Sequence, residues 1–224
     1  RFSLPEPAGH LWQIPEDVKR EKESLLEKLI ISVVQKLTKV ALSLWIKVNI
    51  HQPENWDKNR AEIVIVNHQS GLDPFIIGAF LDRKIAFLTK STSFAHFLPR
   101  YFLKWLMGLP TTRYKTDPGI IYTIKKFLGA GIKVGIFPEG ERTWSGKMQP
   151  FKVSFVKVLM ASRQPVCPLI LKNAFVFWPR WAKFPRRATV DIYSGAPFCL
   201  VPNLFSIDEQ KQFLEDYFRK ILGE

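Results

Sequence analysis

The sequence predicts an α/β protein with a mostly parallel or mixed central sheet covered by helices, preceded by an N-terminal amphipathic helix. Two observations carry this prediction. From residue 51 onward, short runs rich in β-branched residues alternate with segments of helical periodicity, the pattern of a helix-covered sheet. Before residue 51, one long segment has the spacing of an amphipathic helix. We therefore divide the chain into an N-terminal segment (1–50) and an α/β domain (51–224).

Residues 16–49 predict a single long helix. At 100° per residue, six of its polar side chains fall within about one third of the circumference, and the rest of the circumference is mainly apolar. These six are Lys28, Ser32, Lys36, Lys39, Ser43 and Lys47. A narrow cationic stripe beside a wide apolar face is typical of a helix that lies in a membrane interface, here with Trp45 near its end. The alternative is a helix that packs on the core and leaves one polar edge in water.

The α/β part contains five expected strands and five expected helices. The strands are expected at 62–66, 84–89, 133–137, 166–171 and 189–195. The helices are expected at 74–82, 94–106, 117–130, 151–162 and 206–222. The last helix begins with the sequence SIDE, which predicts a capping box between Ser206 and Glu209.

The composition favours an anionic membrane surface as a partner. The formal net charge is +13, and aromatic residues make up 13% of the chain. Basic residues attract anionic surfaces, and Trp and Phe favour the headgroup region of a bilayer. Basic and aromatic residues alternate in two tracts, where we expect Trp105, Trp178 and Trp181 to contact the membrane. No uncharged apolar run is long enough to span a bilayer, and no recognition motif supports nucleic acid as a partner.

A candidate catalytic pair lies in the sequence NHQSGLDPF. His68 follows a β-branched run, and Asp73 precedes Pro74, which suits the first turn of a helix, so Asp73 is expected to be the N-cap. A loop that turns at Gly71 can bring His68 and Asp73 together. A carboxylate bonded to one imidazole nitrogen leaves the other free to accept a proton. The alternative is an ordinary loop histidine beside a helix cap.

Basic positions further along the chain suggest a phosphate site. In the sequence FPEGERT, a tight turn at Glu139 and Gly140 precedes Arg142, whose planar guanidinium can hold a phosphate bidentately. Residues 83–116 contain seven Lys or Arg and no acidic residue, among them Lys90 and Arg113. The alternative is a surface turn with solvated charges. The two cysteines offer neither a disulfide framework nor a metal site.

These blocks, in this order, resemble the 1-acyl-glycerol-3-phosphate acyltransferase family of glycerolipid synthesis. The matching sequences are NHQSGLD, FLTK, GLPTTR, FPEGERT and PVCPLIL, and they span residues 62–171. The resemblance implies that 51–224 is a catalytic domain. It implies transfer of a fatty acyl group from acyl-CoA or acyl carrier protein to the free hydroxyl of a lysophospholipid. The first expectation for that acceptor is 1-acyl-glycerol-3-phosphate, which would give phosphatidic acid.

The resemblance also implies roles for single residues. His68 would be the general base, and Asp73 would orient it. The residues that would hold or shape the site for the acceptor's phosphate are Lys90, Arg113, Glu139, Gly140 and Arg142. No metal and no cofactor other than the thioester co-substrate is expected. The protein is expected to be peripheral or monotopic on the cytoplasmic face of a membrane.

Two of these blocks depart from the family's pattern. Glu141 and Thr143 stand where Thr and Ser are usual around the arginine, and Thr112 stands where Asp often precedes Arg113. A carboxylate that pointed toward the phosphate would repel it, so we expect Glu141 to face solvent or to pair with a base. A related acyltransferase with another acceptor (glycerol 3-phosphate, an aminolipid or a glycolipid) stays open. So does a non-catalytic basic protein that binds membranes or lipids.

Overall fold

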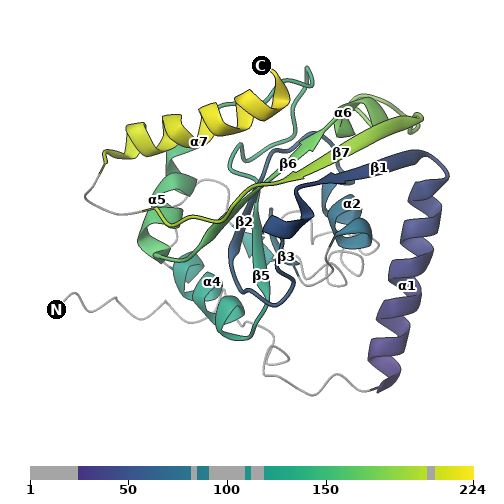
Figure 1. Cartoon of the computed structure of the whole chain (residues 1–224), viewed down its shortest axis with the longest axis horizontal. Coiled ribbons are helices and arrows are strands. Elements are labelled where there is room, and N and C mark those ends of the chain that lie inside the picture. Colours follow the sequence, from purple (N-terminus) through teal and green to yellow (C-terminus); the bar gives the residue numbers. More distant parts are fainter. Residues whose placement is uncertain (1–24, 82–84, 91–108, 112–118, 201–204) are drawn as a thin grey trace.

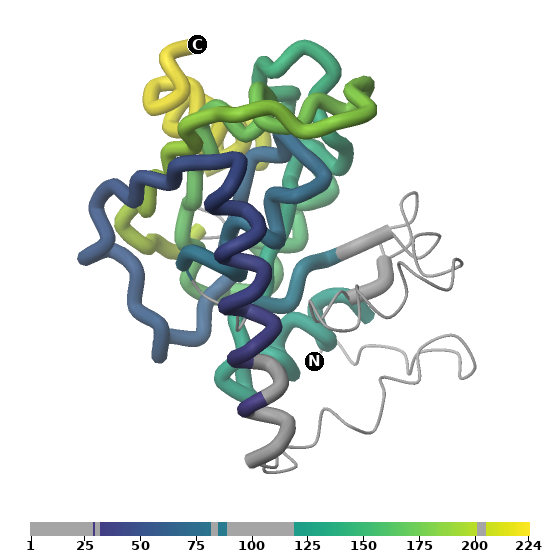
Figure 2. The backbone as a smooth tube through the Cα atoms, turned by 90° about the vertical axis from the view of Figure 1, so that its right-hand side faces the viewer, coloured from purple at the N-terminus to yellow at the C-terminus, as the bar shows by residue number. Residues whose placement is uncertain are grey.

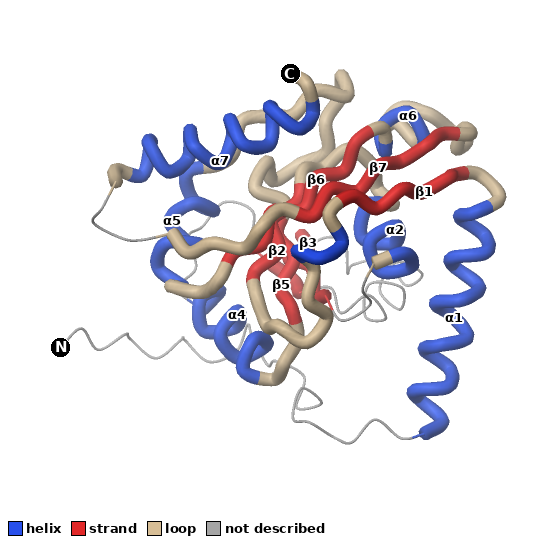
Figure 3. Tube along the Cα trace, in the orientation of Figure 1, coloured by secondary structure: helices blue, strands red, loops and turns tan. Residues whose placement is uncertain are grey.

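A computed structural model of the chain describes residues 25–81, 85–90, 109–111, 119–200 and 205–224. In these residues a twisted sheet lies between two groups of helices (Figures 1 and 3). The α/β class with a mixed, helix-covered sheet is therefore confirmed. The membrane role of the N-terminal helix stays a prediction.

Within the described residues, seven strands form one mixed sheet in the order β1-β7-β6-β2-β5-β3-β4. The strands are β1 (Ile46–His51), β2 (Ile63–Val66), β3 (Ile85–Lys90), β4 (Leu109–Thr111), β5 (Lys133–Ile136), β6 (Val166–Lys172) and β7 (Ala188–Ser194). Neighbouring strands are parallel except β6 and β7, which pair antiparallel. The strands β2, β5 and β6 therefore end at one edge of the sheet, the edge where open α/β sheets place ligands.

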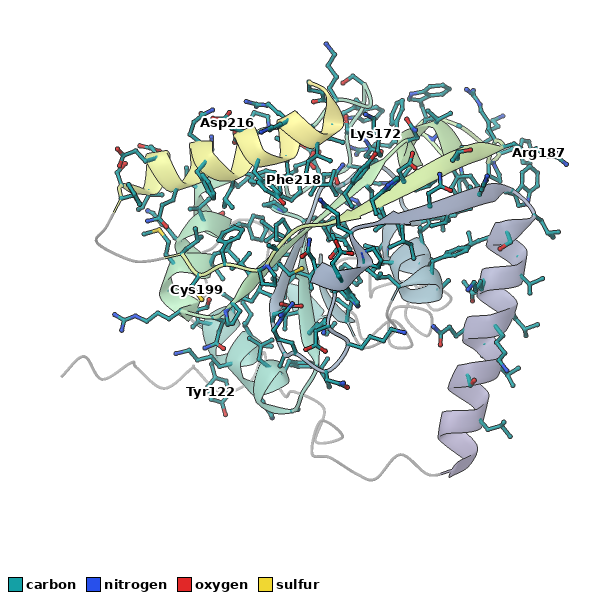
Figure 4. All side chains as sticks on the ribbon, viewed as in Figure 1. Tyr122, Lys172, Arg187, Cys199, Asp216 and Phe218 are labelled. Carbon is teal, nitrogen blue, oxygen red and sulfur yellow. The ribbon has the colours of Figure 1, made fainter. Side chains whose placement is uncertain are left out.

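Helices cover both faces of this sheet. They are α1 (Leu25–Ser43), α2 (Asp73–Phe80), α4 (Gly119–Gly129), α5 (Val153–Ser162), α6 (Ala174–Phe177) and α7 (Ile207–Leu222), with a short 3-10 turn, η2 (Pro53–Asn55). One buried cluster joins the sheet to α2, α6 and Leu42 of α1, and a second joins it to α4, α5 and α7. Phe218 lies on the side of α7 that faces the sheet (Figure 4). Strand β2 is buried throughout because its alternate residues enter the two clusters.

The expected elements of the α/β part are confirmed where the structure describes them. All five strands are present, as are the helices expected near 74–82, 117–130, 151–162 and 206–222. The capping box is present too: Ser206 Oγ accepts from the N–H of Glu209, whose carboxylate accepts from the N–H of Ser206. The helix expected at 94–106 lies outside the described residues. The short elements β4 and α6 were not predicted.

The long N-terminal helix is shorter than expected. Its described part ends at Ser43, and Ile46–His51 forms β1, which pairs in parallel with β7. The expectation of a helix to Asn49 is therefore wrong. Residues 46–51 alternate apolar and polar side chains, so they suit an edge strand. Trp45 and Lys47 accordingly lie in a turn and on a strand rather than on the helix, and the division proposed at residue 50 falls within β1.

Helix α1 packs on the rest of the molecule along one side only. Gln35 Nε2 donates a 3.0 Å hydrogen bond to the carbonyl oxygen of Gly78, Leu42 is buried, and Lys39 Nζ lies 5.4 Å from the Phe80 ring centroid. Figure 2, in which α1 faces the viewer, shows its outer side uncovered by other elements. Four apolar side chains at helical spacing are exposed there: Leu29, Val33, Leu37 and Val40. Within the described residues, no helix combines the length and hydropathy needed to cross a bilayer.

Candidate active site

Three loops meet at the edge of the sheet where β2, β5 and β6 end. His68 follows β2, the turn with Glu139 and Arg142 follows β5, and residues 173–187 connect β6 to β7. Because β2 is hydrogen-bonded to both β5 and β6, these three loops are neighbours although they are far apart in sequence. The topology thus gathers the residues that the sequence singled out at 67–75 and 137–143.

His68 and Asp73 form a close pair. The imidazole Nδ1 lies 2.8 Å from Asp73 Oδ2, with Asp73 fully buried and the His68 side chain 18% exposed. An ionised carboxylate can only accept hydrogen bonds, so in this pair Nδ1 carries the proton and Nε2 presents a lone pair. No described residue hydrogen-bonds to Nε2, which leaves it available to a substrate hydroxyl.

The Asp73 carboxylate turns back toward the loop that precedes its own helix. Oδ2 accepts 2.8 Å hydrogen bonds from the backbone N–H groups of Gln69 and Ser70. Helix α2 begins at Asp73, its N-cap is Leu72, and no side chain caps it. The expectation that Asp73 is the N-cap is therefore wrong, because its carboxylate binds the loop instead of the first helical turn. This arrangement ties the orientation of the carboxylate to the path of the His68 loop.

The rings of Phe137 and Phe87 form a stack against one face of the His68 imidazole. The His68 ring lies 4.0 Å from the Phe137 ring at an interplanar angle of 19°, and Phe137 stacks in turn on Phe87 at 5.4 Å. A Cβ atom at Gly135 would stand only 2.4 Å from the Phe87 ring. Glycine at position 135 therefore makes room for the ring that carries the stack.

Glu139 holds the backbone of His68. Its buried carboxylate accepts a 2.7 Å hydrogen bond from the His68 N–H at Oε1 and a 2.9 Å hydrogen bond from the Gln149 N–H at Oε2. Burial raises the pKa of Glu139 to about 8, although the two N–H groups act to lower it. The sequence suggested that Glu139 shapes a phosphate site; the structure shows in addition that its carboxylate braces the His68 loop.

Two further contacts define the turn after β5. The Thr143 N–H donates a 3.0 Å hydrogen bond to the His68 carbonyl oxygen, so both backbone groups of His68 are bound by this loop. Gly140 has a φ of 75°, and a Cβ atom there would lie 2.8 Å from Lys152 Nζ. A side chain at position 140 would thus meet both a strained backbone and a crowded neighbour.

Arg142 lies against the His68 loop as a half-buried cation. Its Nη1 is 3.0 Å from where a Cβ atom of Gly71 would stand. Burial, and then the nearby charge of Arg180, lower the pKa of Arg142, while Asp73 raises it. Among the residues that the structure describes, no carboxylate forms an ion pair with this guanidinium. A partly buried charge without a counter-ion is unfavourable, so the position suits an incoming anion.

Arg180 is a site residue that the sequence did not single out. Its Nη1 lies 3.5 Å from Glu141 Oε2, and its Cζ lies 4.1 Å from the centroid of the Trp144 ring. The expectation that Glu141 faces solvent or pairs with a base is confirmed by this pair. The only signal for Arg180 was its place in a basic-aromatic tract, which has no motif spacing.

The other predicted residues are described to different extents. Lys90 is the last residue of β3, and its backbone reaches the same edge of the sheet. Arg113 and Trp105 lie outside the described residues, and only the backbone of Lys28 is described. Lys36, Lys39 and Lys47 are exposed. Trp178 is partly buried and donates to the Ala182 carbonyl oxygen, whereas Trp181 is exposed under Arg186.

No group of three or more potential metal ligands was found among the described residues. This edge of the sheet presents a paired histidine beside a half-buried cation. Such a pair can take a proton from a hydroxyl, and such a cation can hold an anionic group nearby.

The match to known proteins agrees with this geometry. A family model described as "Acyltransferase" matches residues 47–172, more than half of the chain. The chain belongs to the acyltransferase family. The matched segment contains His68, Asp73 and Arg142, which supports the family resemblance expected from the sequence.

Two curated relatives of this acyltransferase-family chain carry the same name. It is 25% identical over 144 residues to a 1-acyl-sn-glycerol-3-phosphate acyltransferase of Cocos nucifera, an alignment that covers 62% of this chain and 46% of the relative. It is 28% identical over 158 residues to the protein of that name in Saccharomyces cerevisiae, covering 65% and 50%. The chain thus spans about half the length of the curated relatives it matches.

A solved structure shows the same fold. It is the 1-acyl-sn-glycerophosphate acyltransferase PlsC of Thermotoga maritima, with a TM-score of 0.70 at 22% sequence identity. The alignment covers 88% of this chain and 80% of that one. The mixed sheet with its flanking helices is therefore an architecture already found in this family.

Proposed function

We propose that this acyltransferase-family chain transfers a fatty acyl group from acyl-CoA or acyl carrier protein to the free hydroxyl of 1-acyl-glycerol-3-phosphate, giving phosphatidic acid. The observation that carries the proposal is the His68–Asp73 pair beside Arg142, a half-buried cation for which the described residues supply no ion-pair partner. The names of the curated relatives support the choice of acceptor.

In the proposed reaction His68 is the general base. Its Nε2 takes the proton of the acceptor hydroxyl while that oxygen attacks the thioester carbonyl carbon. When the tetrahedral intermediate collapses, the C–S bond breaks and the imidazolium returns the proton to the leaving thiolate. A positioned base of this kind contributes roughly 10²–10⁴-fold. The buried Asp73 keeps Nδ1 protonated and stabilises the imidazolium that forms between the two steps.

Arg142 is proposed to bind the phosphate of the acceptor. A guanidinium matches phosphate geometry with two parallel N–H donors, and burial strengthens the interaction. Lys90 and Arg113 complete the proposed site, with the turn at Glu139 and Gly140 shaping its edge. The acceptor hydroxyl would then be held near Nε2 by the same molecule whose phosphate is bound.

The protein is proposed to work at the cytoplasmic face of an anionic membrane. The exposed apolar side of α1 supports this, flanked by the exposed Lys36 and Lys39. The Ala188 N–H donates to the Trp45 carbonyl oxygen, so the start of β7 lies beside the turn that follows α1. Arg187, at the tip of this region, projects on the same side of the molecule as α1 (Figure 4). A lipid substrate would be drawn from the surface that this side contacts.

A donor–acceptor panel tests the proposal. Acyl-CoA and acyl carrier protein would each be combined with lysophosphatidate, glycerol 3-phosphate, a lyso-aminolipid, a glycolipid and monoacylglycerol, with products measured by mass spectrometry. We expect phosphatidic acid as the main product. A different main product would reassign the acceptor. Binding to anionic liposomes with no acyl transfer in any combination would instead identify a non-catalytic lipid-binding protein.

A further inference from the structure

Arg180 contacts two residues that flank Arg142 in the turn after β5. Its Nη1 is 3.5 Å from the carboxylate of Glu141, one residue before Arg142, and its guanidinium covers the indole of Trp144, two residues after it. The side chain of Arg180 is 29% exposed and that of Glu141 38% exposed. The 3.5 Å separation is long for a charge-assisted hydrogen bond, so this ion pair is loose.

The segment that carries Arg180 is attached to the catalytic loop. Ser70 Oγ donates a 3.1 Å hydrogen bond to the Trp178 carbonyl oxygen, two residues before Arg180. The Phe175 N–H donates to Gln69 Oε1, and Gln69 directly follows His68. The loop after β6 therefore keeps Arg180 in register with the same loop that holds His68 and that Arg142 contacts at Gly71.

Two guanidinium groups close together repel each other unless an anion lies near both. The charge of Arg180 is one cause that lowers the pKa of Arg142, so the two cations do interact. The formal charges of Arg142, Arg180 and Glu141 sum to +1. A phosphate monoester carries about −1.5 to −2 at pH 7 and has several acceptor oxygens, which fits two guanidinium donors.

We propose that Arg180 is the second guanidinium of the phosphate site, stacked on Trp144 and held by Glu141 until the phosphate group of a substrate arrives. This inference rests on the proposed function and assigns a specificity residue within it. Glu141 then has a role in spite of its negative charge: it satisfies Arg180 in the free protein and competes with the ligand for it. The attachment of the Arg180 segment to the loop that follows His68 favours the acceptor's phosphate over the phosphates of a CoA donor.

Kinetics of Arg180→Ala test the inference against two acceptors. We expect the KM for lysophosphatidate to rise about 10-fold or more, the loss typical of a hydrogen bond to a charged group, while the KM for monoacylglycerol stays unchanged. Arg180→Lys keeps the charge but not the planar guanidinium. Its KM for lysophosphatidate should fall between the values of the native chain and of Arg180→Ala. Glu141→Gln should lower the KM for lysophosphatidate in the native background and have no effect in the Arg180→Ala background.

Assays with two acyl donors show whether Arg180 binds the phosphate of the acceptor or a phosphate of CoA. The same variants would be assayed with acyl-CoA and with a phosphate-free acyl thioester of N-acetylcysteamine. A rise in the KM for acyl-CoA without a rise for lysophosphatidate would overturn the assignment to the acceptor. Arg186→Ala is the matched control, because Arg186 also covers an indole, that of Trp181, in the same tract. Assays in detergent micelles remove the effect of membrane binding.

These assays test the role of Arg180 separately from the proposed acylation of lysophosphatidate. If the native chain does not acylate lysophosphatidate, the proposed function fails and the inference with it. If the native chain does so and Arg180→Ala leaves the KM unchanged, or raises the KM for both acceptors equally, only the role of Arg180 is overturned. Urea unfolding of each variant, with Arg180→Lys as the conservative change, separates a loss of binding from a loss of folding.

Discussion

The backbone N–H of His68 donates a 2.7 Å hydrogen bond to the buried Oε1 of Glu139, 71 residues later in the chain. The Thr143 N–H returns a hydrogen bond to the carbonyl oxygen of the same histidine. The main chain of His68 is therefore held by the loop after β5, while its side chain is oriented by Asp73. Two separate sets of contacts position the backbone and the ring of the proposed base.

Glu139→Gln should destabilise the fold and lower activity. Glutamine has one carbonyl oxygen and one NH2 group, so one of the two N–H donors of His68 and Gln149 would face another donor. We expect a loss of roughly 1–3 kcal/mol in the free energy of unfolding. Urea denaturation measures it, and Glu54→Gln, at an exposed position, is the control. Equal stability of Glu139→Gln and the native chain would contradict the bracing role.

The same residue predicts a pH dependence of stability. Burial raises the pKa of Glu139 to about 8 in the folded state, from 4.5 for an ordinary glutamate side chain. Between these values the unfolded chain loses the proton and the folded chain keeps it, so the free energy of unfolding falls as pH rises through about 8. The stability difference between the native chain and Glu139→Gln should therefore shrink from pH 5 to pH 8.5. If this stability difference grows from pH 5 to pH 8.5, burial is not the main influence on the pKa of Glu139.

Asp73→Asn should separate the charge of the carboxylate from its hydrogen bonds. An asparagine oxygen can accept from His68 Nδ1, Gln69 N and Ser70 N, and its NH2 group would take the place of Oδ1, which has no hydrogen-bond partner among the described residues. The fold should persist, but the imidazolium loses its counter-charge. We expect kcat to fall about 100-fold or more with little change in KM. A kcat within a few-fold of the native value would rule out this role.

Gly135→Ala should disturb the ring stack under His68. Its methyl group would overlap the Phe87 ring, which cannot yield without moving Phe137. We expect a loss of about 1–3 kcal/mol in the free energy of unfolding, together with reduced acyl transfer. Gly78→Ala is the control, since a Cβ atom there meets nothing within 4 Å and alanine favours a helix. Similar stabilities of the two variants would argue against a tight fit at position 135.

The exposed side of α1 predicts which substitutions weaken membrane binding. Leu37 and Val40 are 62% and 60% exposed, and burying such side chains contributes about 1.5–3 kcal/mol each. The double variant Leu37→Ser, Val40→Ser should therefore bind anionic liposomes at least about 10-fold more weakly in a sedimentation assay. Tyr122→Ser, on the exposed side of α4, is the control. Unchanged binding would place the membrane contact elsewhere, for example at Trp181.

Much of the fold could be predicted because its signals are local. The apolar strand β2 and the capping box of α7 each depend on residues that are close in sequence. Strand β1 could not be predicted in the same way. It follows α1 with no Gly or Pro between them, and its apolar residues continue the helical pattern closely enough to hide a change of period. Its pairing with β7, more than a hundred residues away, stabilises the strand.

The site was predictable only in part, because only contacts between residues close in sequence leave a local signal. His68 and Asp73 are five residues apart, and a single loop can join them. The hydrogen bond from His68 to Glu139 and the ion pair between Glu141 and Arg180 depend on which strands become neighbours in the sheet. No local spacing encodes those contacts. The expectation that Asp73 is the N-cap was wrong because its carboxylate accepts hydrogen bonds from the N–H groups of the preceding loop.

In the proposed mechanism, His68 removes the proton from the acceptor hydroxyl. The most direct measurement is the rate of phosphatidic acid formation from acyl-CoA and lysophosphatidate by the native chain and by His68→Ala, with the folding of both checked by urea denaturation. We predict a folded variant whose rate falls to the uncatalysed background, since no other described residue is placed to act as the base. Undiminished turnover by the folded His68→Ala variant would contradict the mechanism.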